Sequence, residues 1–267
     1  MKRIDFHTHI FPEDIAPYAL TKLSEGGGGL PCYTYGTPRS LIESMMGSGI
    51  ESSVAMNIAT TPEQQHKVND FAAYVNGEDI VCFGSVHPDA ADALSELDRI
   101  SDLGIAGVKF HLDCQGFEYD HPALKKIYEK IVRLGLIVCF HTGWDLSTGK
   151  CSMTPSNLLK TLPMLEGVPV IAAHFGAYGM LDKSVSKLCG HELYFDTSFS
   201  CGRVPLLVAE KIIRKHGADR ILFGTDSPWG KPQEEIKFIE LLHIPEEDKE
   251  KIFFRNAEKL LQGKVKK

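Results

Sequence analysis

The chain has 267 residues, of which 43% are hydrophobic and 24% are charged, as is usual for a globular protein with a sizeable core. The net charge of -6 offers no basic surface for nucleic acid or for an anionic membrane. No apolar run is long enough for a membrane span, and we expect no signal peptide because the first residues form no apolar segment. We therefore expect a small-molecule substrate and no nucleic-acid or membrane partner, and the sequence leaves a homodimer open.

The cysteines indicate a reducing cellular compartment. Seven cysteines, an odd number without a Cys-x-x-Cys pair, lie mostly in apolar, strand-like runs, which is typical of buried thiols in reducing surroundings. We therefore predict a cytoplasmic protein. The short basic tail of residues 264–267 is expected to be a solvated end.

Two histidines end the first predicted strand, within the sequence Arg3-Ile4-Asp5-Phe6-His7-Thr8-His9. Strand side chains alternate between two faces, so His7 and His9 point the same way. Neutral imidazoles bind zinc and related ions, and this pair indicates half of a metal site. Alone, the pattern is a weak signal, because two ordinary strand histidines would look the same.

Further along the chain, short apolar strands alternate with amphipathic helices. After a polar, glycine-rich loop, strands are expected at residues 53–58, 80–86, 106–111, 136–141, 169–174, 193–197 and 220–226. Helices are expected at residues 38–47, 62–75, 90–103, 121–134, 155–165, 205–216, 232–242 and 247–261.

Eight such units in one chain predict a parallel sheet that is buried on both faces. Their number and the chain length fit a single (β/α)₈ TIM-type barrel over residues 1–267, closed by C-terminal helices. An open, doubly wound sheet is the alternative. The barrel is favoured because polar, functional-looking residues end at least five strands, and because no glycine-rich nucleotide-binding turn follows any strand.

The polar residues at the strand ends predict the site. The carboxyl ends of barrel strands meet at one mouth, which would bring together residues that are more than two hundred positions apart. The residues in question are His7 and His9, Lys109 and His111, His141, His174, and Asp226 with Trp229. Such a cluster of imidazoles with a carboxylate predicts a metal centre.

This pattern resembles the amidohydrolase superfamily. The sequences Phe223-Gly224-Thr225-Asp226-Ser227-Pro228-Trp229 and Phe254-Arg255-Asn256-Ala257-Glu258-Lys259-Leu260-Leu261 are similar to its amidohydrolase-2 branch, which includes aminocarboxymuconate-semialdehyde decarboxylase. The resemblance implies a distorted (β/α)₈ barrel and a divalent metal, commonly zinc. It also implies that the ligands are His7, His9, His141 and Asp226, and that His174 is the catalytic base or an electrostatic partner.

The chemistry of these residue types is consistent with those roles. Three imidazoles and one carboxylate suit zinc and leave a position for water, whose pKa then falls to about 7. His174 would accept the proton of that water or stabilise an oxyanion, and Asp226 would hydrogen-bond the same water as a second catalytic group. Alternatively, His174 is a fourth imidazole ligand.

Several neighbouring residues have more than one candidate role. A strand-four lysine is carboxylated in some superfamily members and bridges two metals, so Lys109 leaves a second ion open; we prefer one metal per chain, with His111 facing the substrate. Trp229, and also Trp144, would wall the pocket. Arg39 and Arg203 are candidates for binding a substrate carboxylate, or else are solvated charges.

Two reactions fit this site. We expect a metal-dependent hydrolase that uses metal-activated water on a small-molecule amide, lactone or related bond. The alternative is a metal-dependent, non-oxidative decarboxylase of a small carboxylic acid, which is disfavoured because no arginine ends a metal-bearing strand. A non-catalytic metal-binding scaffold is a third class, which has no need for the proton-transfer groups His174 and Asp226.

Overall fold

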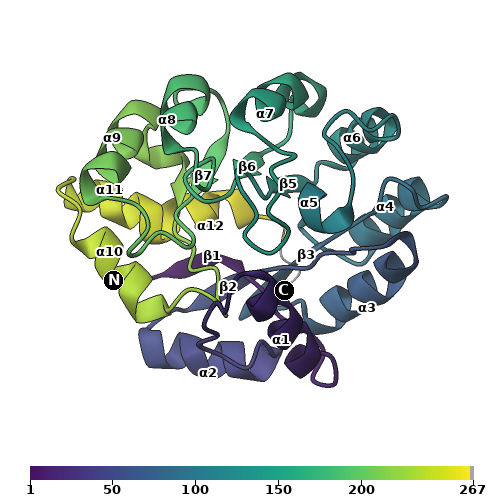
Figure 1. Cartoon of the computed structure of the whole chain (residues 1–267), viewed down its shortest axis with the longest axis horizontal. Coiled ribbons are helices and arrows are strands. Elements are labelled where there is room, and N and C mark those ends of the chain that lie inside the picture. Colours follow the sequence, from purple (N-terminus) through teal and green to yellow (C-terminus); the bar gives the residue numbers. More distant parts are fainter. Residues whose placement is uncertain (265–267) are drawn as a thin grey trace.

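The computed structural model describes residues 1–264, and its centre is a sheet of eight parallel strands (Figure 1). Each strand pairs with the next one in the chain, which is the strand order of a (β/α)₈ barrel. The strands are β1 (Ile4–Thr8), β2 (Ser52–Met56), β3 (Ile80–Gly84), β4 (Gly107–Phe110), β5 (Ile137–Phe140), β6 (Val170–Ala172), β7 (Tyr194–Asp196) and β8 (Ile221–Leu222).

The last strand closes onto the first through backbone hydrogen bonds. The amide of Phe6 donates to the carbonyl of Phe223 (2.7 Å), and the amide of Asp226 donates to the carbonyl of His7 (2.8 Å). These bonds continue beyond the short β8 and bring the two ends of the sheet together. The predicted barrel is thereby confirmed as a nearly closed one.

Helices surround the sheet in a ring (Figure 1). They are α1 (Ala16–Gly26), α2 (Pro38–Ser48), α3 (Gln65–Val75), α4 (Ala93–Asp102), α5 (Leu112–Gln115), α6 (Leu124–Leu134), α7 (Pro155–Thr161), α8 (Leu181–Lys183), α9 (Leu206–His216), α10 (Pro232–Glu240), α11 (Glu246–Glu250) and α12 (Asn256–Leu261). Short 3₁₀ helices span Pro62–Gln64, Leu162–Leu165 and Ala218–Arg220, and π-helical turns span Ser184–Leu188 and Lys251–Arg255.

Two of these elements differ from the expectation. The region after the first strand, expected to be a loop, contains α1, in which Ala16 is the buried residue. Such an exposed helix has no broad apolar stripe, and periodicity therefore does not reveal it. The helix expected at residues 247–261 is divided into α11 and α12 by a π-helical turn.

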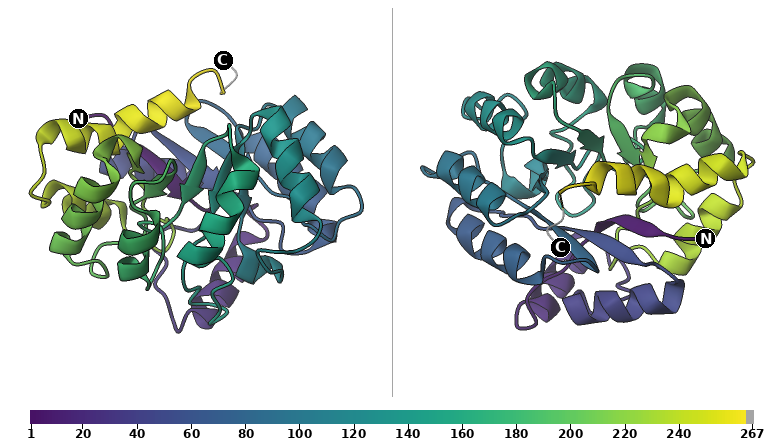
Figure 2. Two further views of the ribbon diagram at one scale, coloured as in Figure 1. Left: turned by 90° about the horizontal axis from the view of Figure 1, so that it is seen from above. Right: turned by 180° about the vertical axis from the view of Figure 1, so that it is seen from behind.

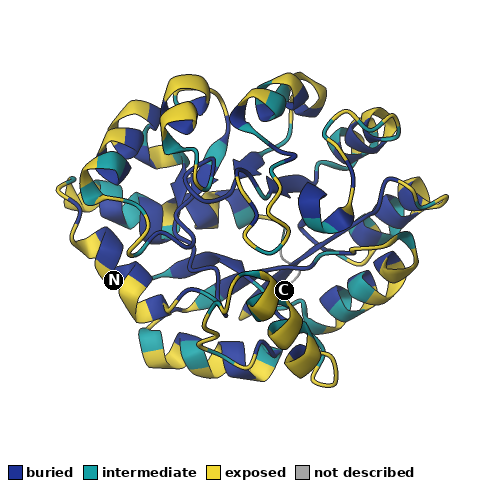
Figure 3. Ribbon diagram, viewed as in Figure 1, coloured by how far each residue is buried: buried dark blue, intermediate teal, exposed yellow. Residues whose placement is uncertain are grey.

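The strands separate two apolar cores. Figure 3 shows the strands buried and the outer faces of the surrounding helices exposed. One core lies between the sheet and the helices and contains residues such as Phe110 and Phe140. The other fills the barrel with inward side chains such as Phe6 and Phe83, and α12 adds Ala257 to it. Figure 2 shows α12 across one end of the barrel and α1 at the opposite end.

None of the helices in residues 1–264 combines the length and the apolar character needed to cross a bilayer. Cys82 and Cys139 are buried, as expected for apolar strand positions, but the expectation of mostly buried thiols is wrong for the other five cysteines. Cys32 is exposed, and the rest are partly exposed because they lie in loops or helices outside the strands, namely Cys114, Cys151, Cys189 and Cys201. Of the basic tail, Lys264 donates a hydrogen bond to the carbonyl of Gly135 (2.5 Å), and residues 265–267 lie outside the described range.

Candidate metal centre and active site

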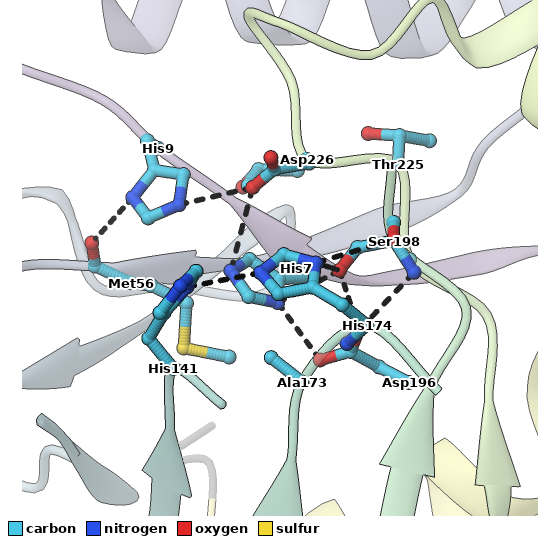
Figure 4. Close-up of polar contacts among 12 residues, drawn as sticks. His7, His9, Met56, His141, Ala173, His174, Asp196, Ser198, Thr225 and Asp226 are labelled. Atoms are coloured by element: carbon cyan, nitrogen blue, oxygen red, sulfur yellow. Dashed lines mark hydrogen bonds and ion pairs between the residues drawn. The ribbon is translucent and has the colours of Figure 1, made fainter. Parts of the chain in front are cut away.

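A cluster of histidines and one aspartate lies at the carboxyl ends of the strands (Figure 4). The Nε2 atom of His9 lies 3.2 Å from Oδ1 of Asp226, and the Nε2 atom of His7 lies 3.5 Å from the same oxygen. One potential ligand atom from each of the three residues lies within 4.8 Å of the other two. The structure therefore brings together three of the four predicted metal ligands.

The other nitrogen of each of these rings is held by an acceptor. Nδ1 of His7 is 2.8 Å from Oδ2 of Asp196, and Nδ1 of His9 is 3.1 Å from the backbone carbonyl of Met56. Each Nδ1 must carry the proton that it donates, which leaves the Nε2 lone pair directed at Asp226. Histidines that bind metals are oriented in the same way by carboxylates and carbonyls.

The fourth predicted ligand, His141, faces His174. Nδ1 of His141 and Nε2 of His174 are 3.1 Å apart. His174 donates through Nδ1 to the carbonyl of Ser198 (3.2 Å), and His141 donates through Nε2 to the carbonyl of Trp144 (3.4 Å). Because both donors point away from the gap, two nitrogen lone pairs face each other, and this arrangement requires a cation or a shared proton between them.

A divalent cation fits this set of acceptors. A second group of acceptors consists of the Nε2 lone pairs of His7 and His9 and Oδ1 of Asp226, which face one another. The donor beside this group is Lys109, whose Nζ lies 3.3 Å from Nε2 of His7. Nitrogen and carboxylate ligands of this kind suit zinc and its neighbours in the transition series.

Burial and charge keep these groups in the protonation states that metal binding needs. Burial, assisted by Lys109, lowers the pKa of His7 to about 4. Burial raises the pKa of Asp226, but the imidazoles of His9, His7 and His174 outweigh this and bring it down to about 2. At neutral pH the cluster thus offers neutral imidazoles and an ionised carboxylate.

The backbone is strained where two of these side chains enter the site. His174 has a φ of 59° and Asp226 a φ of 63°, in the left-handed region that most residues avoid. Close packing also requires Gly224, because a Cβ at this position would lie 2.9 Å from the Cβ of His7. The local chain is therefore shaped to direct these side chains inward.

The end of β7 supplies two functional residues that the sequence reasoning missed. Asp196 is fully buried and holds His7, and Ser198 donates to Oδ1 of Asp196 (2.5 Å) while its Oγ lies 2.9 Å from Nδ1 of His174. The available signal was an acidic residue at the end of a predicted strand, the same signal that identified Asp226.

His111, predicted to face the substrate, lies against His141. Their rings are 4.0 Å apart at the centroids and within 7° of parallel. Nε2 of His111 is 3.4 Å from Oδ2 of Asp145, a residue that the sequence reasoning did not select. Burial lowers the pKa of His111, but Cys114 and Asp145 outweigh it and raise the pKa to about 9.

The remaining predicted residues are distributed around the cluster. Lys109 is fully buried, and its Nζ lies between Nε2 of His7 (3.3 Å) and Sγ of Cys139 (3.6 Å), deeper in the barrel. The ring of Trp229 packs edge-on against His9, with centroids 5.2 Å apart. Trp144 is 45% exposed.

The two candidate arginines differ in position. Arg39 is on the surface, where its Nε pairs with Glu43 at 3.1 Å, and the side chain is 84% exposed. Arg203 lines a cavity of about 390 Å³ together with His174. Other side chains on its walls include Tyr178, Leu181, Phe199 and Val204.

This cavity has the volume of a small-molecule site. Neither His111 nor Trp229 is among the residues that line it. A second hollow of about 540 Å³ lies between residues 201–206 and α10, and Arg203 lines this one as well.

Comparisons with known proteins show what this chain is similar to. The model of the amidohydrolase family matches residues 4–263. No curated protein matches the chain.

Solved structures share the fold at low sequence identity. An uncharacterised TIM-barrel protein from Bordetella bronchiseptica is 20% identical with a TM-score of 0.76, covering 99% of each chain. A 2,6-dihydroxybenzoate decarboxylase from Rhizobium is 16% identical with a TM-score of 0.73, covering 98% of this chain and 99% of its own. A dihydroxybenzoic acid decarboxylase from Polaromonas, with bound manganese, is 19% identical with a TM-score of 0.74, covering 98% and 97%.

Proposed function

Because the chain belongs to the amidohydrolase family, we propose that it is a metal-dependent enzyme that removes carbon dioxide from a small carboxylic acid without oxidation. The Rhizobium and Polaromonas proteins of the same fold are decarboxylases, which supports this reaction over the hydrolysis that the sequence favoured. Hydrolysis of an amide or lactone stays an untested expectation.

The observation that carries the proposal is the character of the cavity at His174. Its walls combine the apolar side chains of Tyr178, Leu181, Phe199 and Val204 with the polar side chains of Asp182, Ser198, Ser200 and Arg203. A substrate carboxylate held against the apolar part of these walls would be partly removed from water, which would destabilise the charged acid relative to a product that leaves as neutral carbon dioxide. Hydrolysis would instead need water at the reacting carbon.

We assign the metal to His7, His9, His141 and Asp226, with one divalent ion per chain. Three imidazoles and a carboxylate are a typical set for zinc, and manganese is the alternative because the Polaromonas protein binds it. When bound, the ion would supply positive charge to polarise a substrate oxygen.

His174 is proposed as the proton donor. Loss of carbon dioxide leaves the bonding electron pair on carbon, and a proton must be delivered there to complete the product. Ser198 orients the ring through Nδ1, so Nε2 is the position from which the proton would leave. Because burial lowers the pKa of His174, the ring is neutral at neutral pH, and Nε2 would first take up a proton from solvent or from the acid group of the substrate.

The reaction class is tested by supplying 2,6-dihydroxybenzoate and related hydroxylated benzoates to the metal-loaded protein. We expect release of carbon dioxide, no oxygen-18 from labelled water in the organic product, and one deuterium on its carbon when the solvent is deuterium oxide. The control is His174→Ala, which should release no carbon dioxide above background. If amides or lactones are turned over with one oxygen-18 in the product acid, and no acid is decarboxylated, the enzyme is a hydrolase.

A further inference from the structure

The strand that carries His7 is irregular at this residue. A regular strand would point Asp5 and His7 to the same face. Between Asp5 and Thr8, however, three steps along β1 match only two steps along β2. An extra residue of this kind is a β-bulge, which redirects the side chains beside it. The bulge separates the two side chains, and Nε2 of His7 lies 3.3 Å from Nζ of Lys109, which is buried in the barrel.

The carboxyl group of Asp5 connects the two chain segments that carry His7 and Asp226. Its Oδ1 accepts hydrogen bonds from the amides of His7 (3.2 Å) and Thr225 (2.9 Å), and its Oδ2 accepts one from the Thr225 hydroxyl (2.5 Å). The amide of His7 belongs to the bulge, where the ladder is interrupted, and Asp5 supplies the acceptor that this amide needs. Asp5 is only 1% exposed, and burial of an acidic group is costly unless hydrogen bonds of this kind compensate for it.

Thr225 extends this contact to Asp226. While its hydroxyl donates to Asp5, its Oγ1 accepts a hydrogen bond from the amide of Ser227 (3.0 Å). These two contacts hold the chain on both sides of Asp226, whose φ of 63° is unusual for a residue other than glycine. The amide of Asp226 in turn donates to the carbonyl of His7 (2.8 Å). The bulge at His7 and the left-handed turn at Asp226 are therefore fixed by one connected set of hydrogen bonds.

We propose that Asp5 and Thr225 are positioning residues for the metal centre, although neither is a ligand. Together they fix the directions of His7 and Asp226. Without the Thr225 hydroxyl, the amide of Ser227 would lack this acceptor and Asp5 would lack one donor, so the left-handed turn would relax. Metal affinity would then fall, since partners behind the ligands typically contribute about 10- to 100-fold. This inference rests on the metal site of the proposed function and not on its reaction.

The proposal is tested by titrating the protein, freed of metal with a chelator, with Co²⁺, whose visible absorption depends on the geometry of its ligands. At pH 8, above the pKa of about 7 to which burial raises Asp5, this group is mostly ionised. Thr225→Val keeps the shape of the side chain, and it should weaken Co²⁺ binding at least about tenfold and change the spectrum. Thr225→Ser should bind Co²⁺ within about twofold of the unchanged protein, because the hydroxyl is restored.

Thr8→Val is the matched control. Thr8 lies between His7 and His9 and is as fully buried as Thr225, but its hydroxyl donates to the carbonyl of Val54 (2.9 Å) in β2. Its removal should lower the free energy of unfolding in urea and leave Co²⁺ affinity within about twofold, with the same spectrum. Equal weakening of Co²⁺ binding in Thr8→Val and Thr225→Val, or no weakening in Thr225→Val, would overturn the proposal.

Asp5→Asn is a second test that does not depend on the folding of Thr225→Val. The new amide keeps an oxygen for the two backbone donors but turns a donor toward the Thr225 hydroxyl, so it should also weaken Co²⁺ binding. The loss in the double variant should be smaller than the two single losses combined, because both changes break the same contact. Fully additive losses, or unchanged binding in Asp5→Asn, would contradict the proposed role.

Failure of the proposed function would appear differently, because Co²⁺ binding is measured without a substrate. A protein that needs Asp5 and Thr225 to bind Co²⁺ but decarboxylates no acid would refute the reaction and leave the positioning role standing. A protein that binds no Co²⁺ would overturn both.

Discussion

The imidazole of His111 lies flat against that of His141, with the ring centroids 4.0 Å apart and the planes 7° from parallel. Ligand atoms of these two residues and of Asp145 lie within 4.8 Å of one another, which resembles a second metal site. The lone pair of an imidazole nitrogen lies in the plane of its ring, so two stacked rings cannot direct their lone pairs at one ion. The geometry therefore favours a single metal, at the site assigned to His7, His9, His141 and Asp226.

The first prediction is the metal content. Elemental analysis of the purified protein should find about one divalent ion per chain, since these ligands satisfy one first shell with an open position. Replacing His7 and His9 together with alanine should remove it, and Lys109→Ala should retain it. Two ions per chain, with one of them lost in Lys109→Ala, would instead mean that Lys109 helps to bind a second metal.

The second prediction separates a proton donor from a ligand at His174. If this residue transfers protons, His174→Ala should keep most of the metal and lose about 10²- to 10⁴-fold in turnover. Asp226→Ala should lose both metal and activity, because its carboxylate lies next to Nε2 of His7 and of His9. Metal analysis and turnover on the same preparations distinguish the two roles, and loss of metal from His174→Ala would identify it as a fourth imidazole ligand.

The third prediction concerns Asp196, which holds Nδ1 of His7 at 2.8 Å. Asp196→Asn keeps the shape of the side chain and removes the charge that fixes the tautomer of His7. Loss of such a partner typically weakens metal binding by about 10- to 100-fold, which competition with a chelator would measure. The control is Asp145→Asn, whose partner is His111. Equal weakening in both variants would mean that Asp196 acts only through general stability.

The sequence reveals the residues of this site that end apolar strands, but not the residues that act through contacts between distant parts of the chain. His7, His9, His141, His174 and Asp226 were identifiable because the strands that carry them are apolar runs, and barrel geometry brings the ends of such runs to one mouth. The strand order and the placement of these residues at one end of the barrel agree with that reasoning.

The supporting residues follow no such rule. Asp196 is 189 positions from His7, and its role depends on a hydrogen bond that no local pattern encodes. Asp145 likewise lies in a loop after β5 whose shape brings it to His111. The cavity at Arg203 depends on the left-handed conformation of Phe199, a residue type for which the sequence predicts ordinary backbone.

The last prediction is a pH dependence of stability that originates at Glu235. Burial raises the pKa of this carboxyl group from an ordinary value of 4.5 to about 8, although the amides of Cys201 and Ser200 oppose the rise. Between pH 4.5 and 8 the folded chain therefore holds a proton that the unfolded chain has released. Stability then falls as the pH rises through this window, by at most about 1.4 kcal/mol per pH unit.

Urea unfolding at pH 5, 6, 7 and 8 would measure this slope. Glu235→Gln keeps an acceptor for the two amides and cannot ionise, so its stability should fall less steeply than that of the unchanged protein. Asp5, whose pKa burial raises to about 7, adds a parallel loss over a lower window in both proteins. The contribution of Glu235 is therefore the difference between the two slopes, and identical slopes would show that Glu235 is already ionised in the folded protein at neutral pH.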